Sequence, residues 1–352
     1  MRTAITLSVT ALLVAGCLSP EEGDGNRPPD ADGGQSSDPP PGSNEPREPP
    51  AARNDSREQA PAAAGNFSWR SHAPASAPRT EVAAAALGPR IYVIGGFVDV
   101  RATGLVEVYD AEADAWSAAP EFPLPIHHTA AVAHDGKVYV FGGYTTSAFV
   151  PQPLAFRLDP AAGAWESLPN LPRARGAHAA AVLDGKVYLV GGVGVGNALV
   201  AEVDVFDLSM RTWSSVASLP TTRDHLAAVA LDGKIYAVGG RKMTLTTNTG
   251  ALEAFDPAAG AWTALAPMPT PRGGIAAATF QGQFVVLGGE DTQRTYHEAE
   301  AYDPSTGQWR SLPRMPTSRH GLGAAAVGDR VYAMLGGQQP GFTVSPVVES
   351  LG

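Results

Sequence analysis

Cysteine is nearly absent from this sequence of 352 residues, and the one copy is Cys17. A disulfide needs two thiols, so none can form within the chain. A zinc site built from several thiolates is excluded for the same reason. Any fold that follows Cys17 must therefore be stabilised without disulfides or thiolate-bound metal.

Runs of basic residues are also missing. The formal net charge is −10, and no segment interleaves Lys or Arg with aromatic residues. Proteins that bind nucleic acid neutralise many phosphates with clustered basic side chains, and this sequence has no such cluster. We therefore expect no nucleic-acid partner.

Residues 1–16 are typical of a secretory signal peptide. Arg2 is followed by an apolar run that ends at Ala15, which is too short to span a bilayer. The stretch "LVAGC" resembles the lipobox of bacterial lipoproteins, which implies cleavage before Cys17 and a diacylglyceryl group on its thiol. A plain signal peptide with an incidental cysteine is the alternative. The resemblance implies an exported protein that is attached to a bacterial membrane, on the periplasmic or cell-surface side, through this lipid only.

Residues 17–65 follow as a segment rich in Pro, Gly, Ser and acidic residues, with no apolar period. Such a composition cannot bury enough apolar surface to offset the entropy of ordering. We predict a disordered tether between the lipidated cysteine and a folded domain over residues 66–352.

The folded region is built from an internal repeat. The stretch "VYLVGGVGVGN" suggests a nucleotide-binding loop at first, but no helix follows its glycines. A double glycine instead ends an apolar strand six times, with the pairs beginning at Gly95, Gly142, Gly191, Gly239, Gly288 and Gly336. All six tryptophans share the period: Trp69, Trp116, Trp165, Trp213, Trp262 and Trp309. Each period contains four short strand patterns, which predicts one four-stranded propeller blade per repeat. We expect each Trp to pack against the next blade.

These features resemble the kelch repeat: an apolar strand, Gly-Gly, a strand with "YD" or "FD", a spaced Trp, then "MP" and an arginine. The resemblance covers residues 66–352 and implies an all-β, six-bladed propeller. The last repeat has no tryptophan after its glycines, whereas "NFSWRS" precedes the first pair. We predict that this N-terminal strand completes the last blade and closes the ring.

Two features of the repeat predict where a ligand would bind. The loops after the double glycines vary in length and content, and such loops on a rigid scaffold commonly carry specificity. They share a face with the start of each inner strand, where one position of the repeat holds Arg79, Ile126, Arg175, Arg223, Arg272 and Arg319. Beside it lie His127, His128, His178, His225 and His320. A cationic funnel for a carboxylate ligand is one interpretation, since arginine binds carboxylate in a bidentate way. The alternative is that these arginines bond loop carbonyls and neighbouring acids.

The resemblance also leaves the activity open. Kelch proteins include copper oxidases with a Tyr–Cys cofactor, which the lack of cysteine after Cys17 excludes here. They also include bacterial N-acetylneuraminate epimerase, whose reaction needs a carboxylate and an arginine; Glu81, Asp224, Glu290 and Asp291 are candidates for the carboxylate, and no motif singles one out. We expect a noncatalytic scaffold that binds a protein or glycan at the cell envelope, with a sugar-acid mutarotase as the alternative. We expect no cofactor, and no metal site, because no spacing obliges the histidines to converge.

Overall fold

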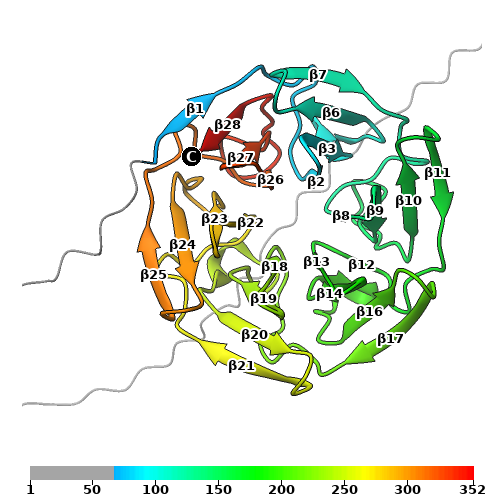
Figure 1. The fold of residues 1–352 in the computed structure, drawn as a ribbon, viewed down its shortest axis with the longest axis vertical. Coiled ribbons are helices and arrows are strands. Elements are labelled where there is room, and N and C mark those ends of the chain that lie inside the picture. Colours follow the sequence, from blue (N-terminus) through cyan, green and yellow to red (C-terminus); the bar gives the residue numbers. More distant parts are fainter. Residues whose placement is uncertain (1–66) are drawn as a thin grey trace, which may run out of the picture. The chain divides into compact units, whose positions relative to one another are not determined.

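The computed structural model of the protein describes residues 67–352, which consist of β-strands, two short 3-10 helices (Val195–Asn197 and Leu245–Thr247) and the loops that join them. Most of the strands form six four-stranded antiparallel sheets, which Figure 1 shows as a ring of blades. This arrangement confirms the predicted all-β, six-bladed propeller. Two short strand pairs lie outside the blades: β4 (Phe97–Val98) with β5 (Arg101–Ala102), and β12 (Arg175–Gly176) with β15 (Val193–Gly194). The predicted signal peptide, Cys17 and the tether lie outside the described residues. Within residues 67–352, no helix has the length and apolar character needed to cross a membrane.

Each blade runs from an inner strand at the centre of the ring to an outer strand at its edge. Blade 1 consists, from inside to outside, of β2 (Ala83–Leu87), β3 (Arg90–Ile94), β6 (Val106–Asp110) and β7 (Ala115–Ala118). Blade 2 consists, in the same order, of β8 (Ala130–His134), β9 (Lys137–Phe141), β10 (Ala155–Asp159) and β11 (Ala164–Ser167). Blade 3 consists of β13 (Ala179–Leu183), β14 (Lys186–Val190), β16 (Val203–Asp207) and β17 (Thr212–Val216). Blade 4 consists of β18 (Ala227–Leu231), β19 (Lys234–Val238), β20 (Leu252–Asp256) and β21 (Ala261–Leu265). Blade 5 consists of β22 (Ala276–Phe280), β23 (Gln283–Leu287), β24 (Ala299–Asp303) and β25 (Gln308–Ser311).

Blade 6 joins the two ends of the described chain. Its inner three strands are β26 (Gly323–Val327), β27 (Arg330–Met334) and β28 (Val348–Leu351), and its outer strand is β1 (Trp69–Ser71). The register pairs Trp69 with Leu351 and Ser71 with Glu349. The predicted closure by the N-terminal strand is therefore confirmed, and it leaves β28 with a neighbour on both sides.

The double glycines allow adjacent blades to approach closely. Gly142 and Gly143 both have positive φ, and a Cβ on Gly142 would lie 2.5 Å from the backbone oxygen of Arg175 in the next blade. The Gly143 N–H donates to that same oxygen. In blade 6 the equivalent pair is Leu335–Gly336 rather than the predicted Gly336–Gly337, because Gly336 N–H makes the corresponding bond to Arg79 O. Leu335 adopts a φ of 57° in the first glycine position.

The tryptophans pack toward the preceding blade, which corrects the prediction that they face the next one. Each Trp shares an apolar cluster with the blade before its own. Each indole N–H also donates to a carbonyl there, as Trp69 does to Pro313 at 2.7 Å and Trp116 to Ala73 at 2.9 Å. The side chain that faces the next blade is instead the tyrosine of the second strand, such as Tyr188 against Phe255.

The two faces of the ring differ as the repeat predicts. One face has short turns in which Asp and Gly both have positive φ, as at Asp184 and Gly185. This combination fits type I′ hairpins. Inside the ring, mostly alanines of the six inner strands line a hollow of about 340 Å³. The other face carries the loops that follow the double glycines and the loops that enter each inner strand. We call this second face the mouth.

Candidate functional site

A ring of six equivalent residues surrounds the axis at the mouth, and we call it the collar. The collar residues lie two positions after the repeated Arg or Ile and are Glu81, His128, Ala177, His225, Gly274 and Gly321. All six have φ between 51° and 69°. Backbone N–H groups of five collar residues donate to the carbonyl of the preceding one, as His128 does to Glu81, and Val82 N–H closes the circle on Gly321. The collar therefore ties all six blades together.

A second ring, which we call the wall, consists of the residues that follow the double glycines. Its members are Phe97, Tyr144, Val193, Arg241, Glu290 and Gly337. Each wall residue pairs through the backbone with the residue just before a collar residue, as Tyr144 does with His127 and Arg241 with Asp224. This pairing fixes the height and direction of each wall side chain relative to the collar.

Collar and wall enclose a cavity of about 490 Å³ at the mouth, a size common for small-molecule sites. Five of the lining side chains are apolar or aromatic: Phe97, Tyr144, Phe149, Val193 and Phe342. Charged and polar side chains line the same cavity: Glu81, His128, Asp224, His225, Arg241, Glu290 and His320. The cavity thus offers both aromatic surface and hydrogen-bonding groups to one occupant.

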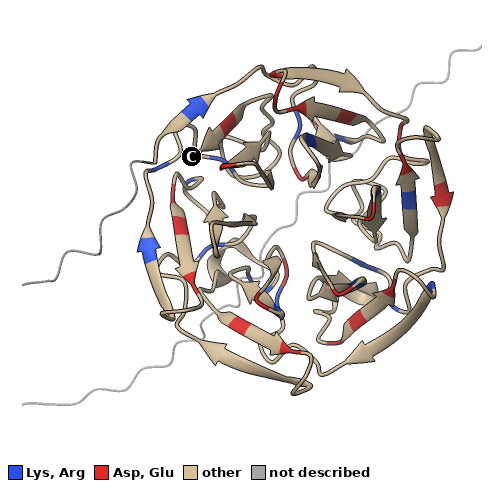
Figure 2. Ribbon diagram, viewed as in Figure 1, with Lys and Arg blue, Asp and Glu red and all other residues tan. Residues whose placement is uncertain are grey.

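The five arginines of the predicted funnel do not line this cavity. The side chains of Arg79, Arg175, Arg223, Arg272 and Arg319 are fully buried within their own blades. Each forms an ion pair with a carboxylate of the third strand: Arg79–Glu107, Arg175–Asp204, Arg223–Glu253, Arg272–Glu300 and Arg319–Glu349. Figure 2 shows these acidic positions recurring on the third strands. Because the guanidinium groups are already paired, we leave these arginines out of the proposed binding site.

The same arginines bond to backbone carbonyls around the double glycine. Arg223 donates to the carbonyls of Gly239 and Ala237, at 2.7 and 2.9 Å. Arg319 donates to Leu335 and Val347, at 3.0 and 2.8 Å. Each arginine therefore holds the bend at which the second strand ends, which matches the structural alternative raised for these residues.

The five predicted histidines lie at different depths. His128, His225 and His320 line the cavity. His127 lies behind the wall, with its ring centroid 4.0 Å from that of Phe97. His178 lies deeper, beside a smaller space of about 80 Å³ under the collar. Burial, together with the charge of Arg175, lowers the pKa of His178 to about 3.

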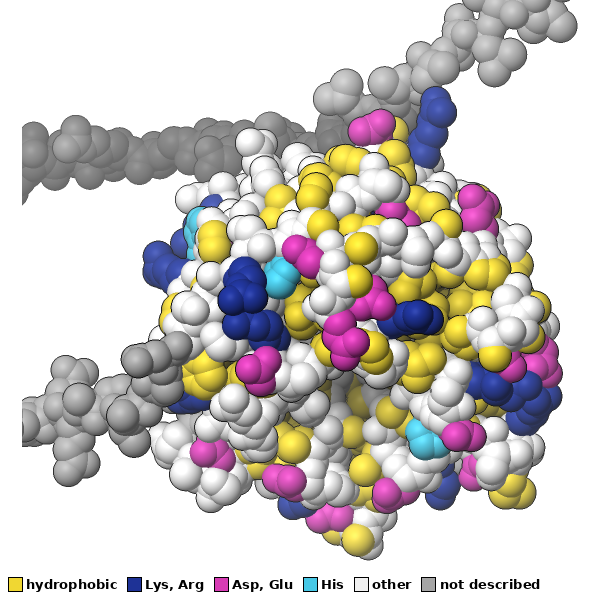
Figure 3. Space-filling model, turned by 45° about the horizontal axis from the view of Figure 1, so that its top comes forward, with side chains coloured by type: hydrophobic (Ala, Val, Ile, Leu, Met, Phe, Trp, Pro, Cys, Tyr) yellow, Lys and Arg dark blue, Asp and Glu magenta, His cyan; other side chains and the backbone are white. Residues whose placement is uncertain are grey.

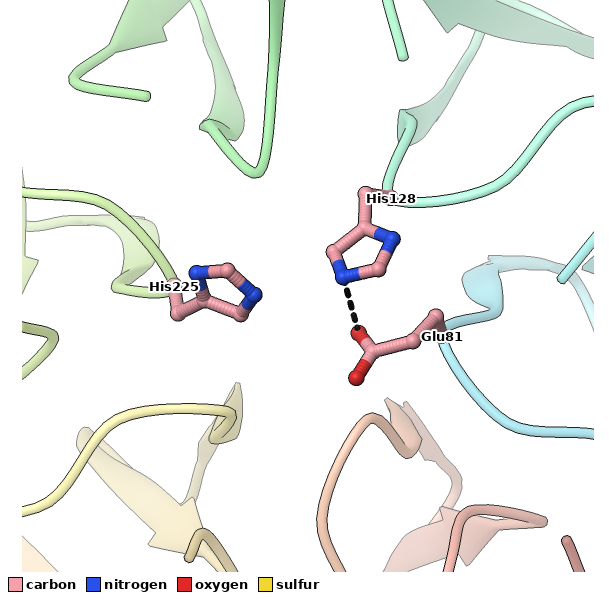
Figure 4. A group of neighbouring side chains, drawn as sticks. All are labelled: Glu81, His128 and His225. Atoms are coloured by element: carbon pink, nitrogen blue, oxygen red, sulfur yellow. Dashed lines mark ion pairs between the residues drawn. The ribbon is translucent and has the colours of Figure 1, made fainter. Parts of the chain in front are cut away.

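Hydrogen bonds orient two of the cavity histidines. The Nδ1 of His225 lies 2.6 Å from Oδ1 of Asp224, and a carboxylate can only accept, so the ring carries its proton on Nδ1. The Nδ1 atoms of His127 and His128 lie 2.6 Å apart, and Nε2 of His127 lies 3.1 Å from the carbonyl of Thr146. Figure 4 shows the His128 and His225 rings directed toward the Glu81 carboxylate from separate blades.

Glu81 is the central acid of the cavity. Its carboxylate lies 3.2 Å from Nε2 of His128 and 3.3 Å from Nδ1 of His320. Burial acts to raise the pKa of Glu81, but the nearby His128, His320 and His225, when their rings are protonated, hold it well below its usual value. Burial likewise acts to lower the pKa of His320, and Glu81 and Glu290 outweigh it, so the pKa of His320 is raised.

Arg241 is the arginine among the residues that line the cavity, and it is already paired. Its Nη1 lies 2.8 Å from Oε1 of Glu290, and its Nε lies 3.6 Å from Oδ1 of Asp224. Of the four carboxylates that the sequence nominates, Glu81, Asp224 and Glu290 line the cavity. Asp291 does not, since it accepts the backbone N–H groups of Gln293 and Arg294 in its own loop.

Apart from Glu290, the wall residues were not predicted from the sequence, and neither were Phe149 and Phe342. A positional signal exists, because the residue after each double glycine must leave the strand next to the mouth. Phe149 and Phe342 lie further along variable loops, whose paths no repeat pattern predicts. Their rings pack on the same cluster, with Phe342 5.4 Å and Phe149 6.3 Å from Phe97 between centroids.

The class that this architecture defines is a β-propeller of repeated Gly-Gly and Trp blades. A family model for the KLHDC2/KLHL20/DRC7 Kelch-repeats domain matches residues 65–220 and 127–337. The chain therefore belongs to the kelch-repeat family.

Individual relatives match short stretches of the chain. Kelch repeat and BTB domain-containing protein 1 of cowpox virus is 32% identical over 84 residues, which are 23% of this chain and 14% of the viral protein. The F-box/kelch-repeat protein At5g03020 of Arabidopsis thaliana is 40% identical over 60 residues, 17% of each chain. The matched stretches thus span under a fifth of these relatives.

A solved structure shares the fold over most of the described chain. The structure titled "Structure of YjhT" superposes with a TM-score of 0.69 at 17% identity. The match covers 78% of this chain and 95% of that one. At this level of identity the likeness concerns the fold, and the mouth residues must be interpreted from their own geometry.

Proposed function

We propose that the propeller is a noncatalytic binding module that holds one sugar unit of a glycan in the mouth cavity. The observation that carries this proposal is the presence in one cavity of an aromatic cluster together with carboxylates and imidazoles. A sugar ring has apolar C–H faces and a rim of hydroxyl groups. The C–H faces suit Phe149 and Tyr144, and the hydroxyl groups suit the carboxylates and imidazoles.

The charge of the cavity favours an uncharged sugar. Glu81, Asp224 and Glu290 contribute three carboxylates, whereas Arg241 is the guanidinium that lines the same space. An anionic ligand would have to displace Glu290 from Arg241 and would face the remaining carboxylates. The hydroxyl groups of a neutral sugar can instead donate hydrogen bonds to those carboxylates without adding another negative charge to the cavity. Sugar acids and acidic peptides are accordingly weaker candidates than neutral glycans.

The surroundings of the cavity suit a ligand that extends beyond it. Large apolar side chains are exposed on the loops that follow the double glycines: Val100, Val150, Val195, Met243 and Phe342. Figure 3 shows acidic and basic side chains interspersed with apolar ones on the face in view, without a large region of one sign. A glycan that leaves the cavity would cross this rim.

The place of action that we propose is the bacterial cell envelope, with the chain attached through Cys17. The supporting observations are the apolar leader, the "LVAGC" stretch and the acidic, proline-rich composition of residues 17–65. Cys17→Ser in the producing cell tests the anchor by fractionation. Transfer of the protein from the membrane to the soluble fraction supports lipidation, and unchanged membrane retention contradicts it.

The binding proposal is tested by titrating neutral and acidic glycans into the full-chain protein and measuring heat or intrinsic fluorescence. We expect a neutral glycan to bind and Phe149→Ala to weaken it by about fivefold or more, since roughly 1–3 kcal/mol is typical of stacking on an aromatic side chain. Met210→Ala is the control, because Met210 is an exposed apolar side chain in the turn between β16 and β17 and does not line the cavity. Absence of binding to all glycans, or equal losses in both variants, would refute the proposal and direct attention to protein partners.

A sugar-acid mutarotase is the second candidate, and one observation favours it. The cavity contains both a carboxylate with a histidine beside it, Glu81 with His320, and an arginine, Arg241. Anomeric exchange measured by NMR in the presence of the protein separates the two functions. Faster exchange that is abolished by Glu81→Gln would identify an enzyme, whereas exchange at the uncatalysed rate supports a binding module.

A further inference from the structure

Three of the six collar positions carry a side chain that can bind a metal ion, and the other three carry alanine or glycine. Glu81, His128 and His225 come from blades 1, 2 and 4, whereas Ala177, Gly274 and Gly321 complete the circle. One carboxylate oxygen and one ring nitrogen from each histidine lie within 4.8 Å of one another. Figure 4 shows the three side chains converging on one point from three separate parts of the ring.

The hydrogen bonds of His127 determine which nitrogen of His128 faces that point. The carbonyl of Thr146 can only accept, so Nε2 of His127 carries a proton and a neutral His127 has a bare Nδ1. The bond between the two Nδ1 atoms is then donated by His128. Its Nε2 is left without a proton, 3.2 Å from the Glu81 carboxylate.

Asp224 likewise leaves the Nε2 of His225 without a proton. Asp224 is nearly fully buried and accepts from Nδ1 of His225, so the Nε2 of a neutral ring carries a lone pair toward the cavity. A carboxylate or ring that bonds the far nitrogen of a metal-bound histidine is the usual outer partner in metal sites, since it fixes both tautomer and orientation. Both collar histidines therefore have such a partner one residue earlier in the chain, His127 and Asp224.

Three electron-pair donors thus face one another, with their donor atoms within 4.8 Å. A proton can be shared by two of these donors at most, whereas a metal ion bonds all three. We propose that Glu81, His128 and His225 bind one divalent transition-metal ion at the floor of the mouth cavity. Two imidazoles and one carboxylate are a ligand set of known Zn²⁺ sites, and a fourth position would open toward the cavity.

The neighbouring cluster of Glu81, Glu290 and His320 serves as an internal comparison. His320 is 1% exposed and its Nδ1 lies 3.3 and 3.5 Å from the two carboxylates. A protonated His320 places one positive charge between these two carboxylates, although neither ring nitrogen makes a hydrogen bond. Two imidazoles around one carboxylate, each with a bare nitrogen, have no such positive charge between them. The ion is therefore assigned to the His128–His225 side of Glu81.

The test uses the full-chain protein, stripped with a chelator and titrated with Co²⁺ and then with Zn²⁺, in the absence of sugar. We expect one Co²⁺ per chain with the visible absorption of a four- or five-coordinate ion, displaced by Zn²⁺. His225→Ala and Glu81→Gln should each weaken binding by more than the roughly 10- to 100-fold loss expected for the outer-partner variant Asp224→Asn. Circular dichroism and thermal unfolding establish that each variant is folded.

Two controls make the result decisive. His134→Ala removes a histidine from the opposite face and should not alter Co²⁺ affinity. His320→Gln should keep one Co²⁺ per chain, and its loss in this variant but not in His225→Ala would move the ion to the other cluster and overturn the assignment. Absence of stoichiometric metal, with ¹⁵N chemical shifts that show a protonated His127–His128 pair, would also refute the proposal. Since no glycan is present, either result stands independently of the proposed glycan binding.

Discussion

Ile126 and Phe156 occupy, in blade 2, the two positions that an arginine and a carboxylate occupy in the other five blades. Both belong to the apolar cluster between blades 1 and 2, and Ile126 is completely buried. The register places Phe156 opposite Val140, as it places Glu107 opposite Val93 in blade 1. The chain thus contains both a buried ion pair and its apolar replacement in one repeated environment.

This substitution predicts strong coupling between the two positions. Arg272→Ile leaves Glu300 buried without its partner and should cost about 3–5 kcal/mol of unfolding free energy. Arg272→Ile combined with Glu300→Phe should recover at least about 2 kcal/mol of that loss, because a well-packed apolar pair replaces a buried ion pair at little cost. Urea unfolding of the two single variants and the double variant measures the coupling, and additive losses would contradict it.

Closure of the ring predicts that Trp69 is held as firmly as an internal tryptophan. Trp69→Phe and Trp116→Phe each remove one indole hydrogen bond to a carbonyl, and each should cost about 1 kcal/mol. Deleting residues 66–71 should also lower the melting temperature, because it uncovers the edge of β28. If Trp69→Phe has no effect while Trp116→Phe destabilises, then β1 does not close the ring in solution.

Because His178 is buried, we expect the free energy of unfolding to depend on pH in a specific way. Its pKa is lowered from 6.5 to about 3 in the folded state by burial and by Arg175. As pH falls below 6.5 the unfolded chain gains a proton that the folded chain does not, so stability is lost, by up to about 1.4 kcal/mol per pH unit, until the pH nears 3. His178→Leu should remove this contribution. Unfolding free energies of both proteins at pH 7 and pH 4.5 provide the check, and parallel losses would contradict it.

A substitution at Gly321 should displace the Glu81 side chain while leaving residue 81 itself unchanged. A Cβ on Gly321 would lie 2.7 Å from Cδ of Glu81, whereas a Cβ on Gly274 would have no neighbour closer than 3.4 Å. Both glycines have positive φ, so each alanine variant should lose about 1 kcal/mol of stability to backbone strain, and Gly321→Ala should lose more because of this close contact. Co²⁺ titration should show weaker binding in Gly321→Ala than in Gly274→Ala. Equal affinities would mean that Glu81 does not contribute to the ion site.

The repeat made the architecture predictable to the level of strands. Gly-Gly and Trp mark the second and fourth strand of every blade, so their spacing alone indicates six blades and the missing outer strand of the last one. The displaced pair in blade 6 was not predicted, because Leu335 takes a left-handed conformation that sequence patterns assign to glycine. The side toward which each Trp packs also depends on tertiary geometry.

The mouth residues were predicted less well. The arginines were nominated by charge and by face, but their partners lie two strands away within the same blade. The clue was available in the strands "VEVYD", "VDVFD", "LEAFD" and "AEAYD", whose acid is replaced in "AFRLD" of the one repeat that has Ile126. The convergence of His128 and His225 had no such clue. It follows from the positive φ of the collar, which directs side chains of blades far apart in sequence toward the axis.

The collar also determines how this surface can change over time. Each blade contributes one collar residue, and the backbone bonds that join the six residues are independent of side-chain identity. An exchange at one of them alters the chemistry at the axis while the backbone bonds between the six positions persist. The mouth therefore combines variable side chains with a fixed backbone frame, on which only close neighbours such as Gly321 and Glu81 affect one another.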